Sequence, residues 1–82
     1  MPHTYILFSE KLNKYYIGST TDIHRRIEDH NRGKERFTRT GTPWQIVYSK
    51  QFEILADARR RELQIKKQKS RKHIERLIAT AG

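Results

Sequence analysis

The stretch from Tyr15 to His30, YYIGSTTDIHRRIEDH, contains phenol, guanidinium and imidazole side chains within a short length of chain. Positions four apart on a helix lie on one face, so Arg26 and His30 project together, one turn apart. A guanidinium is a permanently charged fork that suits phosphate oxygens, and an imidazole can hold or relay a proton. The pair indicates a site that handles phosphate. Taken alone, it also fits two polar members of a solvent-exposed helix face.

Two tyrosines are predicted to border the same site. Alternate residues of a strand share a face, so Tyr16 groups with Gly18. If its strand pairs with the strand of Tyr5 so that both phenols share a face, they border one patch. Gly18 has no side chain, so a ligand could approach the backbone there. Tyrosines that merely fill an amphipathic sheet face are the common alternative.

A carboxylate is expected on the apolar side of a helix over residues 55–68. Leu55, Ala58, Glu62 and Ile65 recur at spacings of three, four and three. Glu62 therefore lies in the apolar stripe, where a carboxylate is costly unless it is paired, hydrogen-bonded or coordinating a cation. Glu62 is a candidate metal ligand. An ion pair with Lys66 one turn later is an equally weighted alternative.

The elements that must position these residues begin with a hairpin. Residues 4–9, TYILFS, and 15–19, YYIGS, are apolar and aromatic enough for two strands around the polar turn EKLNK. A helix then follows, capped by Thr20 or Thr21 and running to about Arg32, with Gly33 at its C′ position.

The second half of the chain is expected to add one strand and two helices. A basic loop, residues 33–43, leads to a strand over 44–52 in which Trp44, Ile46 and Tyr48 alternate with polar neighbours. After the helix over 55–68, Ser70 caps a third helix. The apolar stripe of that helix is Ile74, Leu77, Ile78 and Ala81. The predicted fold is α+β, a small three-stranded antiparallel sheet flanked by helices in the order β-β-α-β-α-α, and residues 1–82 form one domain.

Charge restricts the partners. The 82 residues contain 18 Lys+Arg against 9 Asp+Glu, a net charge of +9, and residues 59–76 carry nine Lys/Arg and two Glu. Such an excess favours a polyanionic partner, most commonly nucleic acid, although a basic surface without a ligand is the alternative. The chain has no cysteine, no apolar run that could span a bilayer and no signal-peptide pattern, so a soluble cytoplasmic protein is expected.

Phosphate contacts are predicted for basic residues of the loop and of the C-terminal half, with a backbone contact at Gly18. The basic residues are Lys34, Arg36, Arg39, Arg61, Lys66, Lys69, Arg71 and Lys72.

Four segments taken together, TYIL, YYIG, DIHRRIEDH and RRRELQIKK, resemble the GIY-YIG nuclease family. The resemblance runs from Thr4 to about Ile78 and is greatest to the small stand-alone branch similar to the N-terminal domain of the excinuclease C subunit. It implies a divalent-metal-dependent phosphodiesterase that uses Mg²⁺ or Mn²⁺. The family's site residues fall on Tyr5, Tyr16, Gly18, Arg26, His30 and Glu62, with Glu62 as the metal ligand. The chain departs from the pattern in its first motif, HTY, and in lacking an asparagine in the third helix.

The chemistry of these residues fits that implication. Phosphodiester hydrolysis needs an activated water and neutralisation of the developing charge. Glu62 with ordered waters could hold one hard cation, and Arg26 could bind phosphate oxygens. Tyr5 could take the proton of the water, provided that cationic neighbours lower its pKa from about 10. Tyr16 and His30 would then be positioning or relay partners.

The expected function is an endonuclease that acts on DNA rather than RNA, with structured or damaged DNA and DNA repair as its setting. It would lie in the cytoplasm, on the nucleoid when bound to DNA, and a protein partner would supply specificity. One alternative is a nucleic-acid-binding module on the same fold that does not cleave. The other is a small structural protein in which Tyr5, Arg26 and Glu62 do not converge.

Overall fold

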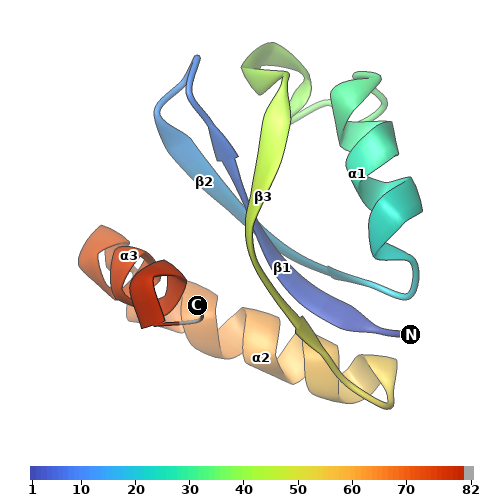
Figure 1. Cartoon of the computed structure of the whole chain (residues 1–82), viewed down its shortest axis with the longest axis vertical. Coiled ribbons are helices and arrows are strands. Elements are labelled where there is room, and N and C mark those ends of the chain that lie inside the picture. The colour runs from blue at the N-terminus through green and yellow to red at the C-terminus, as the bar shows by residue number, and fades with distance from the viewer. Residues whose placement is uncertain (81–82) are drawn as a thin grey trace.

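The computed structural model describes residues 1–80, which form three strands and three helices in the predicted order (Figure 1). The elements are β1 (His3–Ser9), β2 (Lys14–Thr20), α1 (Ile23–Asn31), a short 3₁₀ turn (Arg39–Gly41), β3 (Trp44–Gln51), α2 (Leu55–Gln68) and α3 (Arg71–Thr80). The sheet is antiparallel with the order β2-β1-β3, and this confirms the predicted α+β fold. Within residues 1–80, no helix has both the length and the apolar character needed to cross a bilayer.

The central strand β1 explains the nearly continuous apolar character of its sequence, because it is covered on both faces. Tyr5 and Leu7 pack with Ile23 and Trp44 on the side of α1. On the other side, the Thr4 hydroxyl donates a hydrogen bond of 2.6 Å to the carbonyl of Ala58 in α2. Figure 1 shows α1 on one side of the sheet and α2 with α3 on the other. We call these sides the α1 face and the α2 face.

The alternation predicted for β3 is interrupted by a register shift. Leu7 lies opposite Ile46, whereas the neighbouring Ile6 lies opposite Tyr48, so Val47 is an extra residue in the strand. A bulge of this kind reverses the face of every residue after it. Ile46 therefore lies on the α1 face and Tyr48 on the α2 face. The prediction that they share one face was wrong.

Capping side chains define where the helices begin. Asp22, and not Thr20 or Thr21 as predicted, caps α1, since its carboxylate accepts a hydrogen bond of 3.1 Å from the backbone N–H of Arg25. The helix ends as predicted, with Gly33 at φ +77°.

The cap of α3 was predicted correctly. The Ser70 hydroxyl accepts a hydrogen bond of 3.2 Å from the backbone N–H of His73. The stripe residues Ile74, Leu77 and Ile78 are half-buried, and Ala81 lies outside the described residues.

Candidate active site

A cluster of polar side chains surrounds the Tyr5 hydroxyl on the α1 face. Tyr5 Oη lies 3.2 Å from His30 Nε2 and 3.4 Å from Arg26 Nε. Because Arg26 and His30 are one turn apart on α1, both reach the same phenol, as their spacing predicts.

The second phenol joins this cluster through the pairing of β1 and β2. Tyr5 lies opposite Gly18, and Leu7 lies opposite Tyr16, so both tyrosines are on the α1 face. Their ring centroids are 6.5 Å apart, and the ring of Tyr16 meets His30 in a T-shaped contact at 5.0 Å. Tyr16 is half-buried, whereas only 1% of Tyr5 is exposed.

Two loop residues complete the hydrogen bonding of His30. His30 Nδ1 lies 2.8 Å from Thr38 Oγ1, and the Thr38 hydroxyl also lies within reach of the carbonyl of Glu35, at 3.4 Å. If the Thr38 hydroxyl donates to that carbonyl, it accepts a hydrogen bond from Nδ1–H of His30. His30 Nε2 then accepts a hydrogen bond from the Tyr5 hydroxyl. Burial, followed by the charge of Arg26, lowers the pKa of His30 and favours this neutral imidazole.

Glu35 also holds Arg26 directly. Its Oε1 lies 2.8 Å from Arg26 Nη2, and both side chains are about one-third exposed, at 33% and 30%. Neither Glu35 nor Thr38 was predicted as a site residue. They lie in a basic Gly/Thr-rich loop whose sequence has no periodicity, so nothing in the sequence indicates which of its residues turns back toward α1.

The acidity of Tyr5 differs from the sequence-based expectation. Burial raises its pKa to about 12, and this outweighs the opposing hydrogen bond and charge of Arg26. The condition under which Tyr5 could take the proton of the water, a pKa lowered below about 10, is therefore not met. Two partners already occupy the buried hydroxyl, which makes Tyr5 a poor base in this state.

Gly18 has a different role from the one predicted. A Cβ at this position would lie 2.5 Å from Tyr5 Oη and 2.6 Å from Tyr5 Cζ, and the residue is buried. The absent side chain leaves room for the Tyr5 ring. The prediction that a ligand contacts the backbone of Gly18 on this face was wrong, because the phenol fills that space.

Glu62 lies on the α2 face, across the edge strand β2 from Tyr5. Its Oε1 accepts a hydrogen bond of 2.5 Å from the Ser19 hydroxyl, and its Oε2 lies 2.6 Å from Lys66 Nζ. Only 18% of the side chain is exposed, which confirms its place in the apolar stripe. The predicted alternative, the pair with Lys66, is formed.

The predicted catalytic set is thus only partly assembled. Tyr5, Tyr16, Arg26 and His30 gather on the α1 face, while Glu62 approaches from the other face through Ser19, the neighbour of Gly18 in β2. The carboxylate is near enough that its charge contributes to the raised pKa of Tyr5.

The donor set around Glu62 fits one specific kind of cation. Within residues 1–80, no group of three or more His, Cys, Asp or Glu side chains comes together. Mg²⁺ is commonly bound by one or two carboxylates, with waters and substrate phosphates completing its shell. A single partly exposed carboxylate on α2, beside the edge strand β2, would meet that need if Lys66 left Oε2.

Some of the predicted phosphate-binding residues already have a partner in the structure, and others have no ion pair within residues 1–80. Lys34 pairs with Asp29 at 3.4 Å, and Arg39 Nε donates a hydrogen bond of 3.0 Å to the carbonyl of Gly33. Arg36, Lys69 and Lys72 are exposed and have no ion pair with another described residue in 1–80.

Two arginines of the predicted set have structural contacts. The Arg71 guanidinium donates to the backbone carbonyl of Asn13 at 2.8 Å and to its side chain at 2.7 Å, and it lies 5.1 Å from the Tyr15 ring centre. Arg71 therefore ties α3 to the β1–β2 turn. Arg61 is half-buried, and its Nη1 donates a hydrogen bond of 3.3 Å to Gln64 Oε1, while its Nε has no hydrogen-bond partner within the described part of the chain.

The chain is similar to known proteins over most of its length. The model of the GIY-YIG catalytic domain matches residues 1–75. A UPF0213 protein of Halobacterium salinarum is 38% identical over 67 residues, which cover 80% of this chain and 86% of that protein. A UPF0213 protein of Staphylococcus haemolyticus is 42% identical over 57 residues, 68% and 70% of the two chains.

A solved structure shows the same fold. The solution NMR structure of a UPF0213 protein from Bacillus halodurans has a TM-score of 0.61 and 34% sequence identity, and the match covers 100% of this chain and 88% of that one. By these matches, the chain belongs to the GIY-YIG catalytic domain family.

Proposed function

We propose that this protein is a divalent-metal-dependent endonuclease that hydrolyses phosphodiester bonds in DNA. The observation that carries the proposal is the position of the Arg26–Tyr5–His30 network directly across the edge strand β2 from Glu62. A nucleic-acid strand laid along β2 meets a guanidinium on one side and a carboxylate on the other. Membership of the GIY-YIG family supports a nuclease.

Arg26 binds the scissile phosphate in this proposal. Its Nε is held by Tyr5 and its Nη2 by Glu35, so the guanidinium plane is oriented before substrate arrives. An incoming phosphate replaces the Glu35 carboxylate, since both bind the same fork of donors.

The two phenols have different roles. Tyr5 is a positioning residue, because its buried hydroxyl contacts only Arg26 and His30 among the described side chains. Tyr16 is the more accessible phenol, and we assign it the contact with the attacking water. His30, held neutral between Tyr5 and Thr38, accepts and returns a proton within the network.

Glu62 is the proposed protein ligand of Mg²⁺ or Mn²⁺. When bound, such an ion supplies a Lewis acid that neutralises charge on the phosphate. The Ser19 hydroxyl orients the carboxylate through Oε1. Lys66 pairs with Oε2, and this ion pair would have to open for the carboxylate to hold the ion.

The cellular setting forms part of the same proposal. The net charge of +9 suits a polyanion, and we place the protein in the cytoplasm, acting on DNA in preference to RNA, in DNA repair. A protein partner would direct it to its substrate.

A binding module without turnover is the second candidate. Two ion pairs favour this candidate, because Arg26 is already paired with Glu35 and Glu62 with Lys66. The raised pKa of Tyr5 favours it too. In this reading the same basic surface grips nucleic acid and the cluster only stabilises the fold.

A cleavage screen decides between the two. Single-stranded, duplex, flap and junction DNA are incubated with the wild-type protein in Mg²⁺, in Mn²⁺ and in EDTA. We expect metal-dependent cleavage that Glu62→Gln and Arg26→Gln abolish and that Arg25→Gln retains. Arg25 is the matched control, because it is an exposed arginine on the same helix outside the network. Binding of DNA without metal-dependent cleavage of any substrate would establish the binding module instead.

A further inference from the structure

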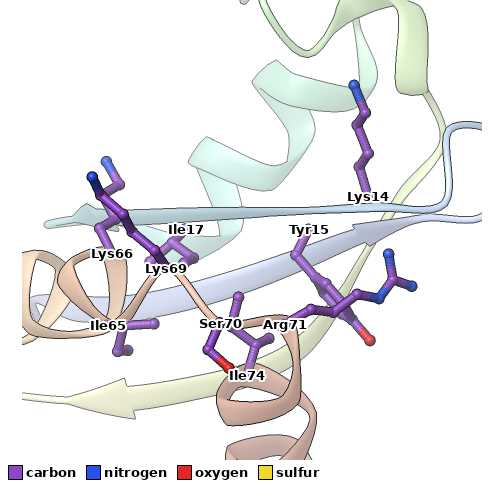
Figure 2. Close-up of a pocket in the computed structure, with 9 residues that line it drawn as sticks. All are labelled: Lys14, Tyr15, Ile17, Ile65, Lys66, Lys69, Ser70, Arg71 and Ile74. Atoms are coloured by element: carbon purple, nitrogen blue, oxygen red, sulfur yellow. The ribbon is translucent and has the colours of Figure 1, made fainter.

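A groove on the α2 face begins beside the candidate metal carboxylate. It has a volume of about 350 Å³ and lies between β2 and the corner where α2 meets α3. Lys66, which pairs with Glu62, is one of its lining residues. Figure 2 shows Lys66 and Lys69 at one end of this groove and Tyr15 and Arg71 at the other.

The floor of the groove is apolar. Ile17 of β2, Ile65 of α2 and Ile74 of α3 point toward one another in Figure 2. Ile65 is 1% exposed, and Ile17 and Ile74 are half-buried. Such a surface suits the flat face of a planar ligand, and the volume is in the range of sites that hold a small molecule.

The rim of the groove is cationic. Of its nine lining residues, all in the described part of the chain, four are Lys or Arg and none is Asp or Glu. Lys69 forms no ion pair with residues 1–80, so its charge is available to a ligand, whereas the Lys14 side chain points away from the groove in Figure 2. Lys66 and Arg71 of the rim pair with Glu62 and Glu75. An apolar floor beside this cationic rim is complementary to a ligand with a flat apolar part and an anionic part.

We propose that this groove binds an unpaired nucleotide of the substrate strand, with its base on the isoleucine floor and a flanking phosphate on Lys69. A single nucleotide has both required parts, and an unstacked base gains by burial against apolar and aromatic side chains. The inference rests on the proposed nuclease function and refines it, because it assigns a substrate with an unpaired segment next to the cleaved bond.

The test follows isoleucine methyl groups by NMR in EDTA, where no cleavage occurs. Protein labelled at its isoleucine methyls is titrated with an oligothymidine of about eight residues. We expect shifts at Ile17, Ile65 and Ile74, and none at Ile46 and Ile54, which are exposed elsewhere, at 41% and 56%. Equal shifts at all five positions, or shifts that appear on concentrating the protein alone, would overturn the proposal that the groove binds a nucleotide.

A ligand-side control isolates the base. A strand of the same length without bases keeps the phosphates, and we expect it to bind about five-fold or more weakly, as the loss of one stacked base predicts. Equal affinity would overturn the assignment of the isoleucine floor as the surface that binds the base. A polyglutamate peptide that shifts the same methyls as strongly would overturn it too, in favour of an acidic protein partner.

A matched pair of variants tests the rim. Lys69→Gln should lower the salt slope of oligothymidine binding by about 0.7 and reduce the Ile74 methyl shift. Lys67→Gln, an identical change at an exposed position outside the groove, should leave that methyl shift unchanged. Metal-dependent cleavage that persists while the groove methyls stay unmoved would reject the groove alone and leave the proposed nuclease intact.

Discussion

The Tyr5 hydroxyl joins more of the candidate site than any other atom. It bonds to two residues of α1, and its ring occupies the space that Gly18 leaves in β2. A buried phenol in such a position orders its neighbours. Its burial also removes it from the water that a base must contact, so Tyr16 is the phenol to which we assign the chemistry.

The different roles assigned to Tyr5 and Tyr16 can be tested by substitution. Tyr16→Phe should lower single-turnover cleavage by about 10²- to 10⁴-fold if its hydroxyl contacts the attacking water, while stability changes little. Tyr5→Phe should instead destabilise the protein by about 1–3 kcal/mol, because it leaves Arg26 Nε and His30 Nε2 without a partner. Urea unfolding and cleavage at saturating metal give the two readouts. A stable Tyr5→Phe protein with the larger loss of cleavage would reverse the roles.

His30 should make stability depend on pH. Its pKa is lowered in the folded state, chiefly by burial, so below about 6.5 the unfolded chain binds more protons than the folded one. The free energy of unfolding should therefore fall as the pH is lowered from 7 toward 5. His30→Gln should flatten this part of the profile. The control is His24→Gln, at an exposed position of the same helix, which should keep the wild-type slope. A steep profile in His30→Gln would assign the effect to other groups.

At the level of elements, periodic segments were predictable from sequence and their partners were not. The helix over 55–68 and the shared face of Arg26 and His30 follow from residue spacings that can be read directly in the sequence. The reversal at Tyr48 depends on a register shift against β1, which alternation within β3 does not record. The contacts of Thr38 with His30 depend on how an aperiodic loop returns to α1. The raised pKa of Tyr5 depends on burial, which only the packed structure defines.

In the proposed mechanism, a charge of the loop before β3 competes with the substrate for Arg26. Glu35 holds the guanidinium of Arg26 at 2.8 Å, so Glu35→Gln should release it and tighten DNA binding. Asp29→Asn is the matched control. It removes one negative charge from the same region, but its partner is Lys34 at 3.4 Å. Fluorescence anisotropy with labelled DNA in EDTA should show the larger gain for Glu35→Gln. Equal gains would mean that net charge alone sets the affinity.

On the scale of the whole molecule, the edge strand β2 separates the two surfaces that the proposed substrate would contact together. The α1 face offers Arg26 and Tyr16, and the α2 face offers Glu62 and the groove that follows it. Because no strand within residues 1–80 pairs with the outer side of β2, both faces can be reached from that edge without moving the sheet. In the proposed function, cationic side chains around this edge would hold the phosphates on either side of the cleaved bond.

Salt dependence tests that electrostatic account. Each duplex phosphate neutralised should contribute about 0.9 to the slope of log affinity against log salt. Lys72→Gln should reduce the slope by about that amount, since Lys72 is exposed and has no ion pair within residues 1–80. Arg71→Gln, its neighbour, should mainly lower stability, because its guanidinium already binds Asn13. If Arg71→Gln changes the slope and Lys72→Gln does not, then Arg71 leaves the β1–β2 turn to grip DNA. An affinity that ignores salt would reject the phosphate contacts altogether.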